Sequence, residues 1–191
     1  MILGNDFTAK PQPLAMNEGS SENQPAGLDF QRHLAEFGVA LAAASGPEDV
    51  WRALQNLTGA VAGFKLFTVM TVDLANDVAR RVYTSHPLEY PVSGTKPIQR
   101  DSWFEIVHGR QELFIANTIE DIAKVFPDHQ KIWAMGCGSV VNLPVMIAGD
   151  MAATINMLHA ENYYGPDRIR QIVRHLTDPA RRAYLVASAW N

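Results

Sequence analysis

The chemistry that this sequence could carry centres on its single cysteine, Cys137, which lies between Gly136 and Gly138. Glycine neighbours leave a sulfur atom accessible, and an accessible thiol can act as a nucleophile or as a redox centre. The alternative is a small buried apolar side chain, a frequent role of free cysteine. With one cysteine, the chain can form neither an internal disulfide nor a cysteine-based zinc site.

The histidines are the candidate proton-transfer groups of this sequence. They are His33, His86, His108, His129, His159 and His175. If the chain is an enzyme, Cys137 would be its reactive group, and the proton would move through His108, His129 or His159. No two histidines have the spacing of metal ligands on one helix, so no metal site is expected. No phosphate-binding loop, dinucleotide fingerprint or defensible Ser-His-Asp order is present, and the sequence indicates no particular cofactor.

Two apolar stretches, residues 140–147 and 151–159, surround a turn at 148–150 and predict a β-hairpin. Side chains alternate between two faces in each arm, and both faces are largely apolar. We therefore expect this hairpin in the centre of an antiparallel sheet that is covered on both sides. Asn142 and Asn156 interrupt the apolar strands, and buried amides need partners from protein, water or ligand.

Hydrophobic periodicity, caps and turn residues predict the other elements. Helices are expected over 28–44, 47–61, 103–108, 119–125 and 129–135, and strands over 64–72, 78–85 and 113–116. The last helix begins after Gly165, and Pro179 predicts a kink or a restart that continues over 180–190. Arg80 and Arg81 indicate an exposed strand near the sheet edge. Residues 86–100 are expected to be a connecting loop.

Composition bounds the class of protein. The chain has 191 residues, of which 47% are hydrophobic, as in a globular domain with a sizeable core. Residues 1–26 mix Pro, Gly, Ser and Asn without periodicity, so we expect a flexible arm followed by one domain over 27–191. A net charge of -4 argues against a nucleic-acid-binding surface. No apolar run reaches the roughly 18 residues that span a membrane, and no secretory signal is evident, so a cytoplasmic location is expected.

The hairpin and the residues after it resemble the second half of a GAF domain. The resemblance rests on residues 139–145 (SVVNLPV), the Gly/Asp turn, residues 153–158 (ATINML), and Gly165-Pro166-Asp167 at the start of a helix. Ala153 stands where glycine is common in the family. The resemblance implies an α+β fold with a central antiparallel sheet of five to six strands. It implies N- and C-terminal helices on one side and a flap of short helices and loops over a pocket on the other.

The resemblance also implies a site and an assembly. The first and last helices of GAF-like proteins often build a dimer, so a homodimer is expected, with simple packing onto the sheet as the alternative. The expected pocket is lined by Tyr83, Ser85, Trp103, His108, Phe114, Asn117, Trp133, Cys137, Ser139, Asn142, Asn156 and His159. Few of these side chains are charged, so a small, neutral or mildly anionic ligand with aromatic contacts would suit the pocket.

Three functions are compatible with the sequence. The first is a stand-alone GAF-like sensor or signalling module that binds a small molecule. The second is a small enzyme on the same scaffold that uses Cys137 and a pocket histidine. The third is a structural subunit with a filled pocket. The fold does not decide among them, since function depends on the site that a fold carries.

Overall fold

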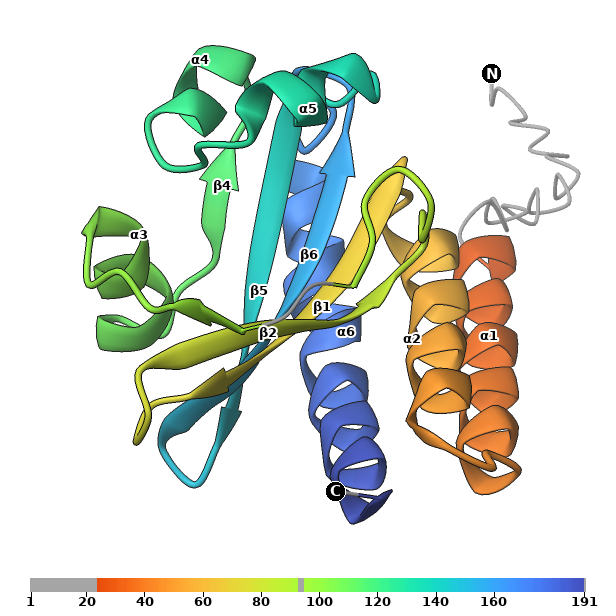
Figure 1. Cartoon of the computed structure of the whole chain (residues 1–191). Coiled ribbons are helices and arrows are strands. Elements are labelled where there is room, and N and C mark those ends of the chain that lie inside the picture. Colours follow the sequence, from red (N-terminus) through yellow and green to blue (C-terminus); the bar gives the residue numbers. More distant parts are fainter. Residues whose placement is uncertain (1–23, 93–94, 191) are drawn as a thin grey trace, which may run out of the picture.

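The computed structural model of the chain describes residues 24–92 and 95–190. Within this part, one antiparallel sheet has the strand order β3-β2-β1-β6-β5-β4 (Figure 1). The strands are β1 (Leu66–Asp73), β2 (Val78–Thr84), β3 (Thr95–Pro97), β4 (Phe114–Ala116), β5 (Ser139–Ile147) and β6 (Asp150–His159). The expected fold class, an α+β arrangement around an antiparallel sheet, is confirmed. Most of the expected arm, residues 1–23, lies outside the described residues.

The predicted hairpin lies in the middle of the sheet, as its two apolar faces indicate. β5 pairs with β6, and β6 pairs on its other side with β1. Pro144 is tolerated in β5 because the pairing of β4 with β5 ends at Asn142, so the backbone of Pro144 has no partner strand on that side. Strand β3, within the expected connection 86–100, was not predicted.

Three long helices cover one face of the sheet: α1 (Gln24–Ala42), α2 (Pro47–Val61) and α6 (Pro166–Ala187) (Figure 1). Proline at the first position and acidic residues in the first turn favour the starts of α2 and α6. Leu54 and Leu57 of α2 and Leu176 of α6 are buried together with Phe67 of β1 and Ile155 of β6 in one apolar core. Packing of the amphipathic stripes thus fixes these helices on the sheet.

Of the two outcomes expected at Pro179, a restart is wrong, because α6 is one helix from Pro166 to Ala187 that contains this proline, and a kink stays a prediction. Pro179 removes one backbone donor, but it is itself buried, and its neighbours Leu176, Ala180 and Ala183 are buried in the helix-side core. Tertiary packing therefore outweighs the local cost of the missing hydrogen bond. A final 3₁₀ turn covers Ser188–Trp190.

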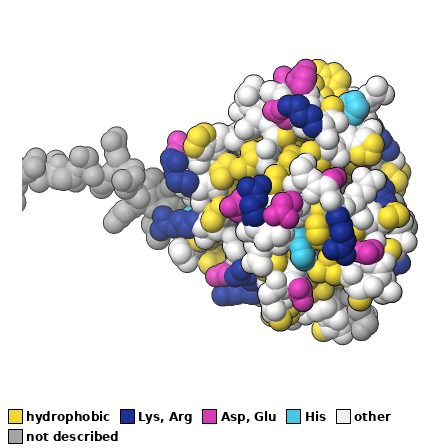
Figure 2. Space-filling view, turned by 90° about the vertical axis from the view of Figure 1, so that its left-hand side faces the viewer, with side chains coloured by type: hydrophobic (Ala, Val, Ile, Leu, Met, Phe, Trp, Pro, Cys, Tyr) yellow, Lys and Arg dark blue, Asp and Glu magenta, His cyan; other side chains and the backbone are white. Residues whose placement is uncertain are grey.

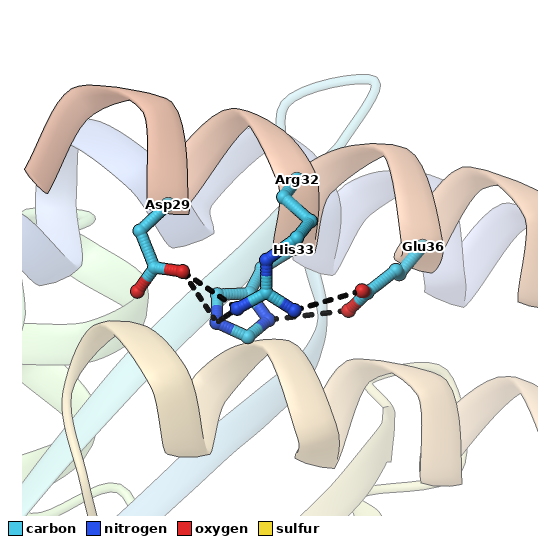
Figure 3. A network of polar contacts seen from close by, with 4 residues as sticks. All are labelled: Asp29, Arg32, His33 and Glu36. Atoms are coloured by element: carbon cyan, nitrogen blue, oxygen red, sulfur yellow. Dashed lines mark hydrogen bonds and ion pairs between the residues drawn. The ribbon is translucent and has the colours of Figure 1, made fainter. Parts of the chain in front are cut away.

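The surface of α1 carries a network of polar contacts among Asp29, Arg32, His33 and Glu36 (Figure 3). The Arg32 guanidinium reaches Asp29 Oδ1 at 2.6 Å and Glu36 Oε1 at 3.0 Å. Such i,i+3 and i,i+4 pairs favour the helical conformation, and solvent screens pairs as exposed as these. These contacts favour the helical conformation of residues 29–36. The helix α1 begins at Gln24, inside the expected arm.

Short elements cover the other face of the sheet, and together we call them the flap. They are α3 (Ser102–Phe104), the π-helical turn η1 (Glu105–Gly109), α4 (Ile119–Ala123) and α5 (His129–Ala134). Asp101 caps α3 by accepting from the Phe104 amide, and Thr118 caps α4 by accepting from the Asp121 amide. Phe104, Ile122 and Ile132 of the flap pack with Val140 and Leu158 of the central hairpin in a second core.

A β-bulge in β2 decides which of its side chains face the flap. β1 pairs with β2 as Val69 with Tyr83 and Met70 with Arg81, so Val82 is an extra residue in β2. Val69 belongs to the helix-side core, whereas Met70 borders a cavity beneath the flap. The bulge therefore places Tyr83 on the helix side and Arg81 on the flap side, although strict alternation would put both on one face.

Candidate functional site: a polar-floored cavity under the flap

A cavity of about 350 Å³ lies between the flap and the sheet. Its apolar wall includes Met70, Val72, Val125, Phe126, Ile132, Val140, Met151 and Leu158. The volume is at the lower end of the roughly 300–1,000 Å³ of ligand pockets.

Figure 2 faces the side that bears α3, α4 and β4, and shows charged side chains of both signs interspersed with apolar ones. This face therefore presents no patch of a single charge.

The floor of the cavity is a chain of hydrogen bonds that crosses β5, β6 and β1. Trp103 Nε1 of the flap donates to Asn142 Oδ1 at 2.9 Å. Asn142 Nδ2 donates to Asn156 Oδ1 at 2.7 Å, and Asn156 Nδ2 donates to Thr68 Oγ1 at 3.1 Å. All four residues line the cavity, and all except Trp103 are buried. This floor links the flap directly to the central strands.

The direction of these hydrogen bonds is set by the indole of Trp103, which can only donate. It therefore requires the oxygen of Asn142, which turns the amide nitrogen of Asn142 toward Asn156. The same reasoning turns the nitrogen of Asn156 toward Thr68. Each amide retains one N–H, and the Thr68 hydroxyl retains its O–H, for a further acceptor. The floor can thus hold a ligand without losing its internal bonds.

Arg81 is the buried charged side chain of this cavity, with 8% of its surface exposed. Its Nη1 donates to the Pro91 carbonyl at 2.8 Å, and its Cζ lies 3.8 Å from the centre of the Tyr90 ring. Its Nε is buried and has no hydrogen-bond partner among the described residues. No carboxylate in the described ranges lies within ion-pair distance of this guanidinium.

Tyr90 and Asp128 form the rim beside Arg81. The Tyr90 hydroxyl donates to Asp128 Oδ2, which joins the chain after β2 to the segment just before α5. Burial, together with the neighbouring Asp128 carboxylate, raises the pKa of Tyr90 well above its ordinary value. Tyr90 therefore stays neutral at physiological pH and can serve as both a hydrogen-bond donor and an aromatic wall.

Three of the twelve side chains predicted for the pocket line this cavity: Trp103, Asn142 and Asn156. Tyr83 and Ser85 instead border a larger hollow of about 830 Å³ beside α2, β1, β2 and the end of α6. The Tyr83 hydroxyl donates there to Gln55 Oε1 at 3.0 Å. The structure therefore does not bring Tyr83 or Ser85 together with the two asparagines, and the bulge at Val82 is the reason.

Other predicted pocket residues lie on the flap half without lining the cavity. His108 stacks on Phe104, and Phe114 is buried edge-on against Phe126. Ser139 Oγ donates to the Ala160 carbonyl at 2.7 Å, so it is occupied by the backbone. Asn117 is half-buried, and its Oδ1 has no partner in the described part of the chain. Trp133 is 53% exposed at the surface of α5.

Cys137 and His159, the residues of the enzyme hypothesis, do not form a reactive pair here. Cys137 is fully buried, and burial raises the pKa of its thiol, which disfavours the thiolate. No histidine in residues 29–92 or 95–190 hydrogen-bonds to it. His159 stacks on Tyr163 and accepts from the Ala160 amide, and burial lowers the pKa of its imidazole. His129 is engaged with the Phe126 carbonyl at 3.1 Å.

The described residues contain no cluster of three or more His, Cys, Asp or Glu side chains that could hold a metal ion. None of their helices is both long and apolar enough to cross a membrane.

Sequence reasoning missed Arg81, Tyr90 and Asp128 as residues of the cavity. An arginine that interrupts an apolar strand was the available signal for the first, and the other two lie in loops with no such signal.

Sequence comparisons give no match to a family model and none to a curated protein. Solved structures do match in shape. The GAF domain of a two-component sensor histidine kinase from Bacillus halodurans has a TM-score of 0.62 at 10% identity, over 77% of this chain and 99% of that chain. The GAF domain of a phosphoenolpyruvate-protein phosphotransferase from Coxiella burnetii has a TM-score of 0.60 at 13% identity, over 88% of this chain and 100% of that chain. The chromophore-binding domain of a bacteriophytochrome from R. palustris has a TM-score of 0.60 at 10% identity, over 86% of this chain and 64% of that chain.

Proposed function

We propose that this chain, which has the fold of GAF domains, is a sensory signalling module that binds a small molecule in the cavity under the flap. The observation that carries the proposal is the polar floor formed by Asn142, Asn156 and Thr68. Burying an amide is costly even when hydrogen bonds offset the cost, so two buried amides in central strands favour a role in recognition over a role in packing. The cavity above them is otherwise apolar, as ligand sites usually are.

The fold neighbours support the sensory part of this proposal. They include parts of a sensor histidine kinase and of a methyl-accepting chemotaxis protein, and a chromophore-binding domain of a bacteriophytochrome. These are properties of those proteins, and their likeness to this chain extends to the fold. The cavity under the flap supplies the local argument for ligand binding.

The bond between Trp103 and Asn142 offers a route for a signal. Trp103 belongs to α3 of the flap, and Asn142 belongs to β5 in the centre of the sheet. A ligand that accepts from the indole or from the Asn142 amide would compete with this bond or reinforce it. Either change alters how firmly α3 is held on the sheet. Ligand binding would therefore shift the position of the flap.

We infer that the helices on the opposite face mediate homodimer formation. Large apolar side chains are exposed on α1, α6 and the final turn: Val39, Val173, Leu185 and Trp190. An apolar surface of this kind favours a protein partner. We expect a dimer in native mass spectrometry and sedimentation, and a shift to monomer in the variant Val39→Asp/Val173→Asp. A wild-type chain that stays monomeric at high concentration would contradict the dimer.

The test of ligand binding is a fragment screen by NMR on the full-length chain, with neutral, anionic and cationic compounds. Binding is read from the indole N–H signal of Trp103, which is assigned with Trp103→Phe. Ala79→Phe fills the cavity from half-buried Ala79, and Val78→Phe is the matched control in the hollow on the opposite face. We expect hits that bind the wild type and Val78→Phe but not Ala79→Phe. Hits that are lost only in Val78→Phe, or no hits at all, would overturn the proposal.

A further inference from the structure

We propose that Arg81 makes the cavity selective for small organic carboxylates with an apolar body, an inference that rests on the proposed function of this cavity. Arg81 is 8% exposed, borders the cavity and has an unpartnered Nε within the described part of the chain. Buried arginines are normally paired, because an uncompensated charge in a protein interior is costly. We therefore expect a ligand to supply this partner.

The groups that hold Arg81 within residues 24–92 and 95–190 engage one of its N–H donors and one face of the guanidinium. The Pro91 carbonyl accepts one N–H, and the ring of Tyr90 covers one face of the guanidinium. Stacking on Tyr90 fixes the plane of the guanidinium while its edge stays available. A planar fork held in this way matches the two oxygens of a carboxylate.

The other charged groups of the cavity do not neutralise Arg81. Asp128 accepts from the Tyr90 hydroxyl, and Asp101 accepts from the Phe104 amide as the cap of α3. Asp101 and Lys96 are exposed at the rim, and Lys131 lies over the Tyr90 ring with its Nζ 5.5 Å from the ring centre. Arg81 is thus the buried cation that a ligand inside the cavity would meet.

The rest of the wall describes the remainder of the ligand. Beside Arg81 the cavity is formed by aliphatic and methionine side chains, with Phe126 and Trp103 as aromatic surfaces. The floor amides of Asn142 and Asn156 each keep one N–H that can donate. The free hydrogen-bonding groups are therefore richer in donors than in acceptors. This combination suits an apolar or aromatic body that ends in an acceptor-rich, negatively charged group.

A carboxylate fits this site better than a phosphate. Phosphate sites usually assemble several donors from helix N-termini and from more than one basic side chain. Here Arg81 is the one buried charged side chain among the described residues of the cavity wall, and one guanidinium balances a single negative charge. The geometry assigns Arg81 the role of a specificity-determining residue that contacts the carboxylate directly.

The experiment compares pairs of probes that differ only in charge, by isothermal titration calorimetry on the full-length chain. The pairs are benzoate with benzamide, phenylacetate with phenylacetamide, and hexanoate with hexanamide. We expect the carboxylate of at least one pair to bind about 10- to 100-fold more tightly than its amide, as for a hydrogen bond to a charged group. Equal affinities within every pair would overturn the proposal, as would tighter binding of phenyl phosphate than of benzoate.

Variants assign the effect to Arg81. In Arg81→Gln the preference for the carboxylate should disappear, while Arg80→Gln is the matched control. Arg80 is the preceding, exposed residue of β2 and borders the hollow on the other face, so its loss should leave the preference intact. A preference that survives in Arg81→Gln would overturn the assignment. The comparison of paired probes in the unmodified chain needs no variant, so it decides the ligand class even if Arg81→Gln fails to fold.

The outcomes separate this inference from the proposed function. If neutral fragments bind in the cavity and carboxylates do not, Ala79→Phe still blocks binding and only the ligand class is wrong. If no fragment of any charge binds, the proposed function and this inference fail together.

Discussion

The two faces of the sheet bury different kinds of side chain. On the helix side, most of the buried side chains of the central strands are apolar, including Phe67, Val69, Ile155 and Met157. On the flap side, Thr68, Arg81, Asn142 and Asn156 are buried within the same strands. One face therefore has the composition of a packing surface and the other that of a recognition surface. Alternation of side chains thus lets one sheet separate stability from recognition.

The largest expected effect compares two neighbouring residues of β6. Met157 is fully buried on the helix side, and Leu158 borders the cavity on the flap side. We expect Met157→Ala to lower the unfolding free energy by about 4 kcal/mol and Leu158→Ala by about 2 kcal/mol. Leu158 has fewer packing contacts to lose because it already faces a cavity. Urea denaturation measures both, and equal losses would contradict the distinction between the two faces.

The next effect concerns the polar floor. Asn142→Leu leaves the Trp103 indole and the Asn156 oxygen without their partner, so it should cost about 1–3 kcal/mol. Asn142→Leu/Asn156→Leu removes the orphaned Asn156 oxygen but deprives Thr68 Oγ1 of its donor, so its stability should stay close to that of Asn142→Leu. Both variants should lose affinity for cavity ligands. A double variant that is less stable than the sum of its single changes would show that the floor serves stability rather than recognition.

Alkaline pH should lower the unfolding free energy of the chain through Tyr90, at the rim of the cavity. Burial holds the pKa of Tyr90 above its ordinary value, so the folded chain keeps this proton at a pH where the unfolded chain has lost it. The unfolding free energy is therefore unaffected below about pH 10 and falls above it, by about 1.4 kcal/mol per pH unit for each such tyrosine. Tyr164 is buried on the helix side and is shifted in the same direction. In Tyr90→Phe the unfolding free energy should fall less steeply with pH above about pH 10, because one of the two tyrosines no longer contributes. An equally steep fall in this variant would contradict Tyr90 as its origin.

The smallest expected effect concerns Cys137, which is buried away from the cavity lining. Cys137→Ala should leave the affinity for cavity ligands unchanged. In the native chain the thiol should react with a chromogenic thiol reagent only as fast as the chain opens, and quickly in denaturant. Rapid labelling of the native chain, or loss of ligand binding in Cys137→Ala, would revive the enzyme hypothesis.

The sequence was sufficient to predict the central hairpin and the helices that pack on the sheet. This prediction rested on the apolar runs around residues 148–150 and on the apolar stripe of α2. Burial of one strand or helix face requires apolar residues at the spacing of that element, so the pattern is visible in the sequence. The path of α6 through Pro179 was not predictable from local rules, since the energy that overrides the proline comes from the buried neighbours Leu176 and Ala183. Local sequence does not report which residues meet across the fold.

The site was predictable only in part, and the bulge at Val82 explains most of the difference. Asn142 and Asn156 were evident because amides interrupt apolar strands. Tyr83 was expected to share their face, but one extra residue in β2 places it on the face opposite to Arg81. A single-residue irregularity reverses the face of every residue beyond it. Arg80 and Arg81 together predicted an exposed strand near the sheet edge because both are charged, although the structure buries Arg81.

Ligand binding beneath the flap is tested most directly by the indole N–H signal of Trp103, in isotope-labelled full-length chain titrated with a ligand from the fragment screen. We expect this signal to shift and saturate in the wild type and to stay fixed in Ala79→Phe. A fixed Trp103 signal, with shifts instead at Gln55 and Tyr83 beside the hollow on the helix side, would contradict binding beneath the flap. The ligand site would then belong to the opposite face of the sheet.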